Sequence, residues 1–337
     1  MKKICFFVNI KKKSLLETIS FYKQDIDILN DLAYEVKIAI KLSDIDWSCD
    51  IIFIWWWTWA FFPVFISKLL RKKTVITGTF NFKCPNAESD YFRRPWHERL
   101  LIYYSVKNTN MNIFVSEKEM LLVREFWSLK NCVYSPHIVP TDKYFPIEGN
   151  LRKENMLLSI CNLTKSSLRR KCLFEMIDTV KILIKKGIDI YYYIAGHEDV
   201  GYVILKEYIQ SEKLEKNVLL LGEIDETKKI SLMRECTIYF QLSKYEGFGL
   251  AIAEAMACGA PVITSDVGEV SNVVGNSGIL CKNYNIEEIA EKIESLLKKR
   301  IERENLSKRA RAQILEKFQY SRRLNDFENI LSNLLIK

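Results

Sequence analysis

The chain has 337 residues, of which 48% are hydrophobic and 27% charged, a composition typical of a globular protein with room for two domains. The net charge of +8 is not gathered in one stripe, and no helix-turn-helix or RNA-recognition signature accompanies it, so nucleic acid is not expected as a partner. Nine scattered cysteines without a Cys-x-x-Cys pair argue against a zinc site or a disulfide framework and favour reduced thiols in a cytoplasm.

Short apolar, β-rich segments alternate with amphipathic helical segments, a pattern typical of parallel sheets covered on both faces. The first series of predicted strands spans residues 4–8, 35–40, 50–55, 74–77, 111–115 and 132–134. The second series spans residues 157–160, 190–195, 218–221, 238–242, 261–264 and 278–280. None is followed by Gly-x-Gly-x-x-Gly, which argues against a dinucleotide-dependent oxidoreductase. The sequence therefore predicts an α/β protein with two Rossmann-like units.

A polar stretch at residues 144–150, with Pro146 and Gly149, is predicted to be the hinge between the units. The predicted domains are residues 1–145 and 146–320, and a C-terminal helix at 321–337 follows helices predicted over 286–318. The apolar run 4–10 is broken by Asn9 and lacks a small-residue cleavage site, so no signal peptide is expected.

An aromatic-rich run covers residues 51–66, and at 16 residues with Pro63 inside it is too short for a comfortable transmembrane helix. It predicts a buried strand that ends near Trp55, then a turn and a helix that reaches Leu70. Core packing is the simpler interpretation. The alternatives are that some tryptophans stack on an acceptor sugar, or lie at a membrane interface beside Lys68 and residues 71–73.

The positive charge lies mainly in the first domain, where residues 1–145 carry 21 Lys and Arg against 15 Asp and Glu. Such a surplus attracts anionic lipid headgroups or a phosphate-bearing acceptor, because each basic residue near an anionic surface contributes about 1 kcal/mol. A mildly basic soluble surface explains it equally well, and the sequence leaves both interpretations open.

The most informative motif follows the predicted strand 238–242. Gly247 and Gly249 allow a close backbone approach or a positive φ, and the helix predicted over 250–258 begins with amides that have no partner inside it. These amides and the helix dipole favour a diphosphate. Glu246 lies at the turn, and Glu254 lies roughly one turn into the helix, where its carboxylate can accept two hydrogen bonds from a ribose diol.

This stretch, Glu-Gly-Phe-Gly-Leu with Glu254 in Glu-Ala-Met-Ala-Cys-Gly-Ala-Pro-Val-Ile, resembles the signature of the retaining glycosyltransferases of family 4, which have the GT-B fold. The resemblance is clear over about residues 157–318. It implies two Rossmann-like domains that face a cleft, the first binding the acceptor and the second the nucleotide-sugar, with the helix at 321–337 crossing back to the first domain. It implies a donor site in which Glu254 holds the ribose and Glu246 lies at the donor sugar. The backbone of Gly247, Phe248, Gly249 and Leu250 would contact the diphosphate.

A second part of the donor site is implied by residues 159–172, which are predicted to open a helix that runs to about Lys186. In the family an arginine and a lysine here grip the diphosphate. Lys171 matches the lysine, but Asn162 stands where the arginine is expected, so Arg170 or Arg169 would supply the second cation. Three basic residues can also be a solvated helix start, although cations at a helix N-terminus oppose the dipole unless an anion is bound.

The resemblance also assigns two loops at the carboxyl ends of strands, Gly196-His197 near the phosphates and Glu223-Ile224 near the base. A histidine that family members often carry after the strand equivalent to 74–77 is missing here, because that position reads Gly78-Thr79-Phe80-Asn81.

The triplets Asp25-Ile26-Asp27 and Asp44-Ile45-Asp46 are similar to the Asp-x-Asp metal motif of the other glycosyltransferase fold, but the first lies in a predicted helix and the second in a loop. No metal is therefore expected, and no cofactor besides the nucleotide-sugar.

The function implied is a metal-independent retaining glycosyltransferase of the hexosyltransferase type. It would move a sugar from a nucleotide-sugar, UDP-sugar first and GDP-sugar next, to a hydroxyl of a glycan or lipid-linked acceptor in bacterial surface polysaccharide synthesis. The expected location is the cytoplasm, with peripheral contact to an anionic membrane left open. The alternatives are a non-catalytic nucleotide-sugar-binding subunit of a partner transferase, and a nucleotide-sugar epimerase.

Overall fold

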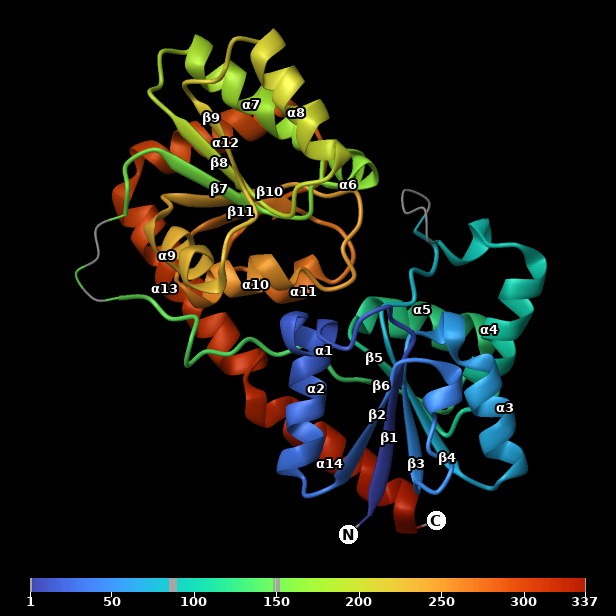
Figure 1. The fold of residues 1–337 in the computed structure, drawn as a ribbon. Coiled ribbons are helices and arrows are strands. Elements are labelled where there is room, and N and C mark those ends of the chain that lie inside the picture. The colour runs from blue at the N-terminus through green and yellow to red at the C-terminus, as the bar shows by residue number, and fades with distance from the viewer. Residues whose placement is uncertain (1, 85–89, 148, 150–151, 337) are drawn as a thin grey trace. The chain divides into compact units, whose positions relative to one another are not determined.

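The computed structural model describes residues 2–84, 90–147, 149 and 152–336. The chain forms two compact α/β units (Figure 1), of which the first comprises Met1–Ile138 with Tyr320–Lys337 and the second Val139–Gln319. Residues just after Ile138 already belong to the second unit, since the Val139 amide donates to the Phe318 carbonyl (2.9 Å) and Tyr144 is buried in its core. Within the predicted hinge, residues 148 and 150 lie outside the described part.

The first unit is built on a six-stranded parallel sheet with the order β2-β1-β3-β4-β5-β6. Its central strands are buried on both faces, as expected for a parallel sheet between helices. In the register of the sheet, Phe6 lies between Ile38 and Phe53. The strands are β1 (Lys3–Val8), β2 (Glu35–Ala39), β3 (Ile51–Trp55), β4 (Lys73–Gly78), β5 (Met111–Phe114) and β6 (Cys132–Tyr134).

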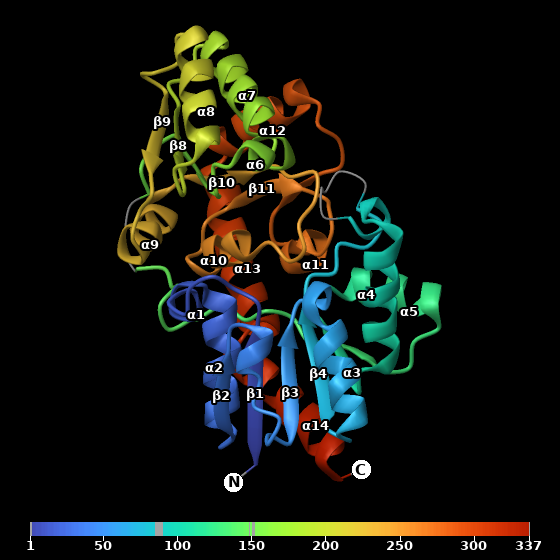
Figure 2. The same ribbon diagram turned by 45° about the vertical axis from the view of Figure 1, so that its right-hand side comes forward.

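Helices cover both faces of this sheet (Figure 2). The helices α2 and α14 pack together on one face, and α3, α4 and α5 cover the other. The helices are α1 (Leu15–Thr18), α2 (Ser20–Asp31), α3 (Phe61–Leu69), α4 (Trp96–Asn108), α5 (Glu117–Trp127) and α14 (Tyr320–Ile336), with 3-10 turns η1 (Leu42–Asp44), η2 (Trp57–Trp59) and η3 (Tyr91–Arg93).

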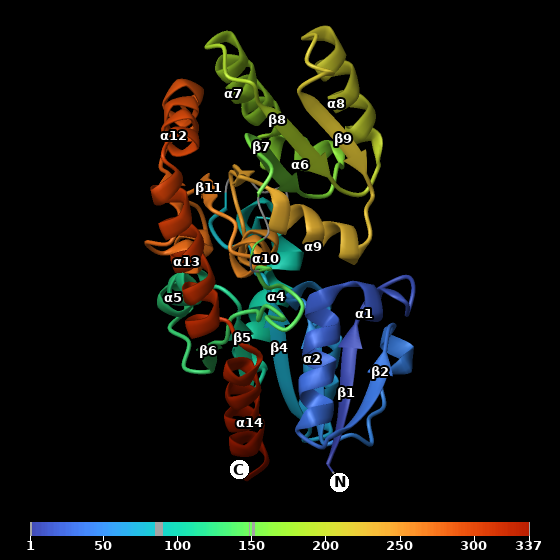
Figure 3. The same ribbon diagram turned by 90° about the vertical axis from the view of Figure 1, so that its left-hand side faces the viewer.

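The last helix, α14, lies beside α2 (Figure 3), and a buried ion pair fixes it to the rest of the first unit. The Arg323 guanidinium donates to both carboxylate oxygens of Asp25 (2.7 and 3.0 Å) and to the Pro136 carbonyl (3.1 Å), and both charged side chains are fully buried. The last helix therefore completes the unit that the first 138 residues begin.

The second unit has its own six-stranded parallel sheet, with the order β12-β11-β10-β7-β8-β9. The strands are β7 (Met156–Ile160), β8 (Tyr191–Ala195), β9 (Val218–Gly222), β10 (Ile238–Gln241), β11 (Val262–Ser265) and β12 (Ile279–Cys281). The helices are α6 (Lys165–Arg170), α7 (Leu173–Lys185), α8 (Val200–Ser211), α9 (Glu226–Glu235), α10 (Leu250–Ala257), α11 (Val270–Val274), α12 (Ile286–Lys298) and α13 (Arg300–Lys317).

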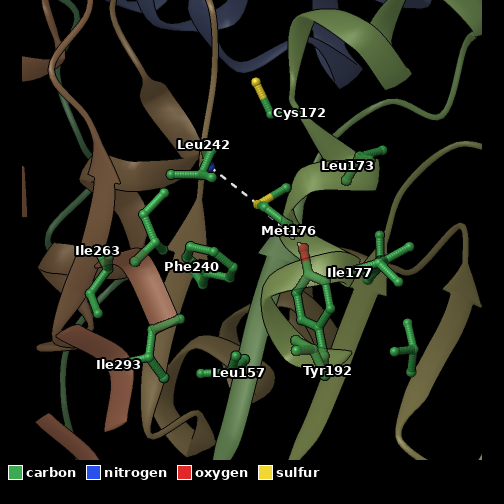
Figure 4. Close-up of a cluster of buried hydrophobic side chains, with 14 of the residues drawn as sticks. Leu157, Cys172, Leu173, Met176, Ile177, Tyr192, Phe240, Leu242, Ile263 and Ile293 are labelled. Carbon is green, nitrogen blue, oxygen red and sulfur yellow. Dashed lines mark hydrogen bonds between the residues drawn. The ribbon is translucent and has the colours of Figure 1, made fainter. Parts of the chain in front are cut away.

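The core beside α7 shows how the sheet of the second unit is held (Figure 4). Leu157, Tyr192 and Phe240, from three neighbouring strands, pack against Met176 and Ile177 of α7. The Met176 sulfur accepts a hydrogen bond from the Leu242 amide (3.2 Å), which ties α7 to the end of β10. This contact holds the loop that follows β10 close to the start of α7.

All twelve predicted strands are confirmed, with bounds that differ by at most one residue at either end. The single helix predicted to run to about Lys186 is wrong, because it breaks into α6 and α7 at Cys172, whose φ is +50°. The helical region 286–318 likewise breaks at Lys299. In the described residues we find no helix with the length and apolarity needed to cross a membrane.

Candidate functional site

The strand order of the second sheet marks where a ligand is expected. After β7 the chain builds outward through β8 and β9 on one side, and then returns to place β10, β11 and β12 on the other. Open α/β sheets bind ligands at the carboxyl ends of the strands where the order reverses, here between β7 and β10. The predicted site residues lie in the segments that follow β7, β8, β9 and β10.

Glu246, in the loop between β10 and α10, is buried among donors. Its Oε1 accepts hydrogen bonds from Ser243 Oγ (2.8 Å), from Gln241 Nε2 (3.1 Å) and from Lys171 Nζ. Its Oε2 lies 3.9 Å from the Arg170 guanidinium. The structure thus brings together the three residues predicted to be catalytic, Glu246, Lys171 and Arg170.

The charge of Glu246 is set by its two cationic neighbours. Burial alone would raise the pKa of this carboxyl, but the charges of Lys171 and Arg170 outweigh burial and hold the pKa below its ordinary value. Glu246 is therefore an ionised carboxylate at neutral pH, and Lys171, which is only 9% exposed, is its closest counter-ion.

Lys171 lies close to Glu246 because the end of α6 is held against the loop that follows β10. The Lys244 amide donates to the Arg170 carbonyl (2.7 Å), which fixes the end of α6 to the loop after β10. Arg169 and Arg170 lie in the last turn of α6, where the helix dipole favours cations. The expectation that these residues oppose a helix dipole at an N-terminus is therefore wrong. Arg169 is exposed, and Asn162 lies exposed in the loop before α6.

Glu254 is buried on α10, in a second charged cluster. Its Oε2 accepts from Lys229 Nζ (3.2 Å), and Lys229 also pairs with Glu226 (2.9 Å) and lies over the Tyr144 ring, 5.0 Å from its centroid. Burial raises the pKa of the Glu254 carboxyl, the charge of Glu226 adds to this, and Lys229 opposes it. The carboxylate thus depends on a neighbouring cation to stay ionised.

Sequence reasoning missed this second cluster. Glu226 and Lys229 are three residues apart on α9, an ordinary helical pair spacing, and Tyr144 lies far away in the chain. Their approach to Glu254 depends on the packing of α9 against α10, which no local pattern indicates.

The segment Gly247, Phe248, Gly249 and Leu250 leads into α10. Gly249 has φ +93°, a conformation that side-chain-bearing residues rarely adopt. The Phe248 side chain is buried and packs edge-on against Phe318, with ring centroids 5.5 Å apart. This side chain is part of the core, so a ligand contact here falls to the main chain, as the resemblance implies.

The two other predicted loops meet at the same edge of the sheet. A Cβ on Gly196 would lie 1.7 Å from the Cys161 carbonyl oxygen, so only glycine allows the loops after β8 and β7 to pack this closely. His197 Nδ1 lies 2.9 Å from Glu223 Oε2, and both side chains are exposed. The hydrogen bond to Glu223, together with its charge, raises the pKa of His197. The neighbouring Ile224 is partly buried against the core.

The first unit has its own cavity, at its own reversal of strand order between β1 and β3. It has a volume of about 270 Å³ and is lined by Asn9, Trp56, Trp57, Thr58, Trp59, Thr79, Phe80, Asn81, Arg94 and Ile102. Trp56 has φ +76°, a strained conformation for an aromatic residue, and its indole N–H donates to the Tyr22 hydroxyl (2.6 Å). The structure thus holds the Trp56 ring in a fixed orientation at a place where α/β sheets bind ligands.

His137 and the aspartates of the Asp25-Ile26-Asp27 triplet contact other residues of the first unit, as expected for structural residues. His137 is buried and stacked on Trp55, and its burial, followed by the charge of Arg323, lowers its pKa well below the ordinary value. Asp25 is the partner of Arg323, and Asp27 pairs with Lys23 (2.9 Å). Over the described ranges, no group of three or more His, Cys, Asp or Glu side chains is placed to hold a metal ion.

A larger hollow of about 880 Å³ lies at the junction of α12 and α13. It contains none of the residues discussed above, and several of its lysines and arginines are already paired with glutamates along the same helices. Its size therefore does not make it a rival to the site at the sheet.

Known proteins resemble this chain mainly over the second unit. The family described as Glycosyl transferases group 1 matches residues 141–313. The N-acetyl-alpha-D-glucosaminyl L-malate synthase of Bacillus anthracis is 30% identical over 136 residues, which are 40% of this chain and 35% of that protein. The N,N'-diacetylbacillosaminyl-diphospho-undecaprenol alpha-1,3-N-acetylgalactosaminyltransferase of Campylobacter jejuni is 26% identical over 245 residues, or 69% of this chain and 61% of that protein.

Solved structures resemble the whole chain. A sucrose-phosphate synthase from Thermosynechococcus elongatus superposes with a TM-score of 0.83 at 15% identity over 100% of both chains. Anabaena HepE, solved with UDP and glucose, has a TM-score of 0.79 at 16% identity and covers 99% of this chain and 100% of its own. At these identities the likeness concerns the fold.

Proposed function

Because the chain belongs to the group 1 glycosyl transferases and has their GT-B fold, we propose that it transfers a sugar from a nucleotide-sugar to a hydroxyl of a glycan or lipid-linked acceptor, with retention of anomeric configuration. A UDP-sugar is the favoured donor and a GDP-sugar the next. Support for UDP comes from the UDP and glucose bound to HepE, which has the same fold.

The observation that carries the proposal is the cluster of buried Lys171 and Glu246 with the partly exposed Arg170, at the reversal of strand order. Transfer leaves a nucleoside diphosphate, so the site must stabilise developing negative charge with fixed cations and amides. Lys171 and Arg170 can supply that charge, and the amides that open α10 can add hydrogen bonds. These groups perform the role that a divalent cation has in metal-dependent transferases, so we propose that the reaction needs no metal.

Glu246 contacts both cations in the loop that follows β10, which suits a group that contacts the donor sugar. In the proposed reaction the acceptor oxygen forms a bond to the anomeric carbon as the bond to the diphosphate breaks, and both events take place on the same face of the sugar. The acceptor proton passes to the departing diphosphate oxygen. Lys171 and Arg170 then neutralise the diphosphate that remains.

Glu254 and its cluster fit the ribose end of the donor. The buried carboxylate can accept hydrogen bonds from the two ribose hydroxyls, and the charge of Lys229 favours its ionised form. The phosphates would contact the backbone of Gly247–Leu250 and the loop at Gly196 and His197, and Glu223 and Ile224 would lie nearest the base.

The cavity of the first unit is proposed as the acceptor site. The fixed Trp56 ring offers a flat apolar surface of the kind on which sugar rings stack, and Asn9, Thr79 and Arg94 supply polar contacts around it. The Campylobacter jejuni relative is named for an acceptor joined to undecaprenol, which supports a lipid-linked acceptor here. We propose that the enzyme works in the cytoplasm, in the synthesis of a bacterial surface polysaccharide.

Calorimetric titration with UDP, GDP and ADP, without added metal, tests the donor site. We expect micromolar binding of one nucleotide to the wild type and a loss of that binding in both Glu254→Ala and Lys171→Ala. The matched controls are Glu207→Ala and Lys206→Ala, which change exposed residues of α8 and are expected to bind as the wild type does.

Turnover of the nucleotide-sugar separates the proposed enzyme from a non-catalytic subunit. Slow donor hydrolysis by the isolated chain supports catalysis, and binding without any hydrolysis or transfer would favour the subunit. If Glu254→Ala and Lys171→Ala both kept turnover within about threefold of wild type, the assignment of this site would be wrong, since losing one stabilising donor typically costs about 100-fold.

A further inference from the structure

An exposed apolar surface lies on the outer side of α3 and α4 in the first unit. We call it the α3–α4 face and define it by Trp59, Phe62, Phe65, Leu69, Trp96 and Leu100, whose side chains are between 42% and 72% exposed. Soluble proteins rarely gather this many large apolar side chains on one surface, and such patches usually mark a contact with a protein or a membrane.

The two helices present this face together because they pack side by side. The Tyr104 ring of α4 lies 5.2 Å from Phe61 and 6.4 Å from Phe65 of α3, measured between centroids. On the inner side, Val64 and Ile102 are buried in the core against the sheet. Residues three, four and seven apart share one side of a helix, so Phe62, Phe65 and Leu69 point outward as a single stripe.

Basic residues predominate in the two segments that carry these apolar side chains, and acidic residues are nearly absent from both. Residues 59–73 contain four Lys or Arg and no Asp or Glu, and residues 91–108 contain four more with one acidic residue, Glu98. Glu98 is itself paired with Arg94 (3.3 Å). The face therefore combines apolar and aromatic side chains with a strong local excess of positive charge.

We propose that the α3–α4 face docks on an anionic lipid bilayer. Tryptophan and phenylalanine side chains enter the boundary between headgroups and acyl chains, and flanking lysines and arginines attract anionic headgroups. A protein partner fits less well, because it would have to supply acidic side chains to match this charge, whereas an anionic bilayer presents negative headgroups over its whole surface. Docking on lipid is a property of this unit alone and requires no transfer reaction.

If the proposed function holds, the position of the α3–α4 face also suggests how the acceptor reaches its cavity. Trp59 belongs both to the α3–α4 face and to the lining of the Trp56 cavity. A bilayer held against this face would therefore lie beside the cavity, where a sugar on a membrane-anchored carrier could enter.

Sedimentation with lipid vesicles tests the proposal. We expect the full chain to sediment with phosphatidylcholine vesicles that contain phosphatidylglycerol, to stay in solution with phosphatidylcholine alone, and to be released as salt is raised. Phe62→Ser/Leu69→Ser/Trp96→Ser and, separately, Arg71→Glu/Arg93→Glu should each reduce the bound fraction at least tenfold.

Matched controls change equally exposed residues of the second unit. Val200→Ser/Val203→Ser/Ile301→Ser and Lys206→Glu/Lys216→Glu should sediment as the wild type does. The thermal midpoint and UDP binding of every variant show whether it is folded and whether its donor site is intact, so a failure of docking is distinct from a failure of the transferase assignment.

Two results would overturn the proposal. One is a failure of lipid binding, seen when the wild-type protein stays in solution with the anionic vesicles or when Phe62→Ser/Leu69→Ser/Trp96→Ser sediments as the wild type does. The other is a wild-type dimer without vesicle binding that becomes a monomer in the triple-serine variant, which would show that a second copy of the chain covers this face.

Discussion

Lys171 and Glu246 are 75 residues apart in the sequence, and their side chains form an ion pair that is almost fully removed from solvent. Lys171 ends α6, Glu246 follows β10, and the hydrogen bond between the Arg170 carbonyl and the Lys244 amide holds the two segments together. A buried charge pair of this kind is sensitive to the loss of either partner, because the remaining charge has no compensation.

Lys171→Met is expected to lower the free energy of unfolding by about 3 kcal/mol, because it leaves the Glu246 carboxylate buried without its nearest cation. Denaturant unfolding measures this. The exposed Lys206→Met serves as the control and should change stability by less than about 0.5 kcal/mol. An unchanged unfolding midpoint in Lys171→Met would show that the pair does not contribute to stability.

The same pair predicts a pH dependence of stability. The folded-state pKa of Glu246 lies below its unfolded value, so its contribution is present above that unfolded value, about 4.3, and is lost as the pH falls through the folded pKa. We therefore expect wild-type stability to fall more steeply below about pH 4.3 than that of Glu246→Gln. If the free energy of unfolding of the two proteins fell equally steeply with decreasing pH, this prediction would be contradicted.

Lys229→Met is expected to make nucleotide binding more sensitive to acid. Burial already raises the pKa of Glu254, and removal of Lys229 removes the cation that opposes this effect. Glu254 would then take up a proton at a higher pH and lose its ability to accept both ribose hydrogen bonds. As the pH is lowered, the affinity for UDP measured by calorimetry should begin to fall at a higher pH in Lys229→Met than in wild type.

The neighbouring Lys228 is exposed, and Lys228→Met should leave that affinity profile unchanged. Identical profiles in wild type and Lys229→Met would show that Lys229 does not control the charge of Glu254.

Glu223→Gln is expected to lower the pKa of His197 toward its ordinary value. Glu223 accepts a hydrogen bond from the protonated ring and attracts its charge, and both effects raise the pKa in the wild type. Because the pKa is raised by folding, the protonated ring favours the folded state below the unfolded pKa, and this contribution is lost as the pH rises through the folded pKa. NMR titration of the His197 ring checks the direction, and an equal or higher pKa in Glu223→Gln would contradict it.

Trp56→Leu is expected to raise the KM for the acceptor about tenfold with little effect on UDP binding, because it removes the flat ring of the first-unit cavity. Trp56→Phe keeps an aromatic face and loses the hydrogen bond to Tyr22, so it should restore much of the affinity. Initial rates at varied acceptor concentration measure both. An unchanged KM in Trp56→Leu would place the acceptor elsewhere.

The strands could be predicted from the sequence because buried parallel strands are short runs of apolar residues, and all twelve lie where the runs lie. The end of α6 could not be predicted, since Cys172 takes a left-handed conformation without the glycine or proline that usually signals one. The resemblance named Glu246, Lys171 and Arg170, and their side chains lie together in the structure, while their roles in the reaction stay predictions. Lys229 was missed because its role depends on how α9 packs against α10, which local spacing does not encode. Ser243 and Gln241 were also missed, although they lie only three and five residues before Glu246.

The pairing of Arg323 with Asp25 has a consequence for how the protein is made. Domains commonly fold in the order in which the ribosome releases them. Here the second unit is complete at Gln319, while the first still lacks α14, whose Phe327 and Leu331 cover Ile4 and Phe53. During translation Asp25 and this apolar surface stay uncovered until the last helix emerges. The half that is made first is therefore finished last, and a ribosome that stalls before α14 leaves an exposed core that chaperones and proteases can recognise.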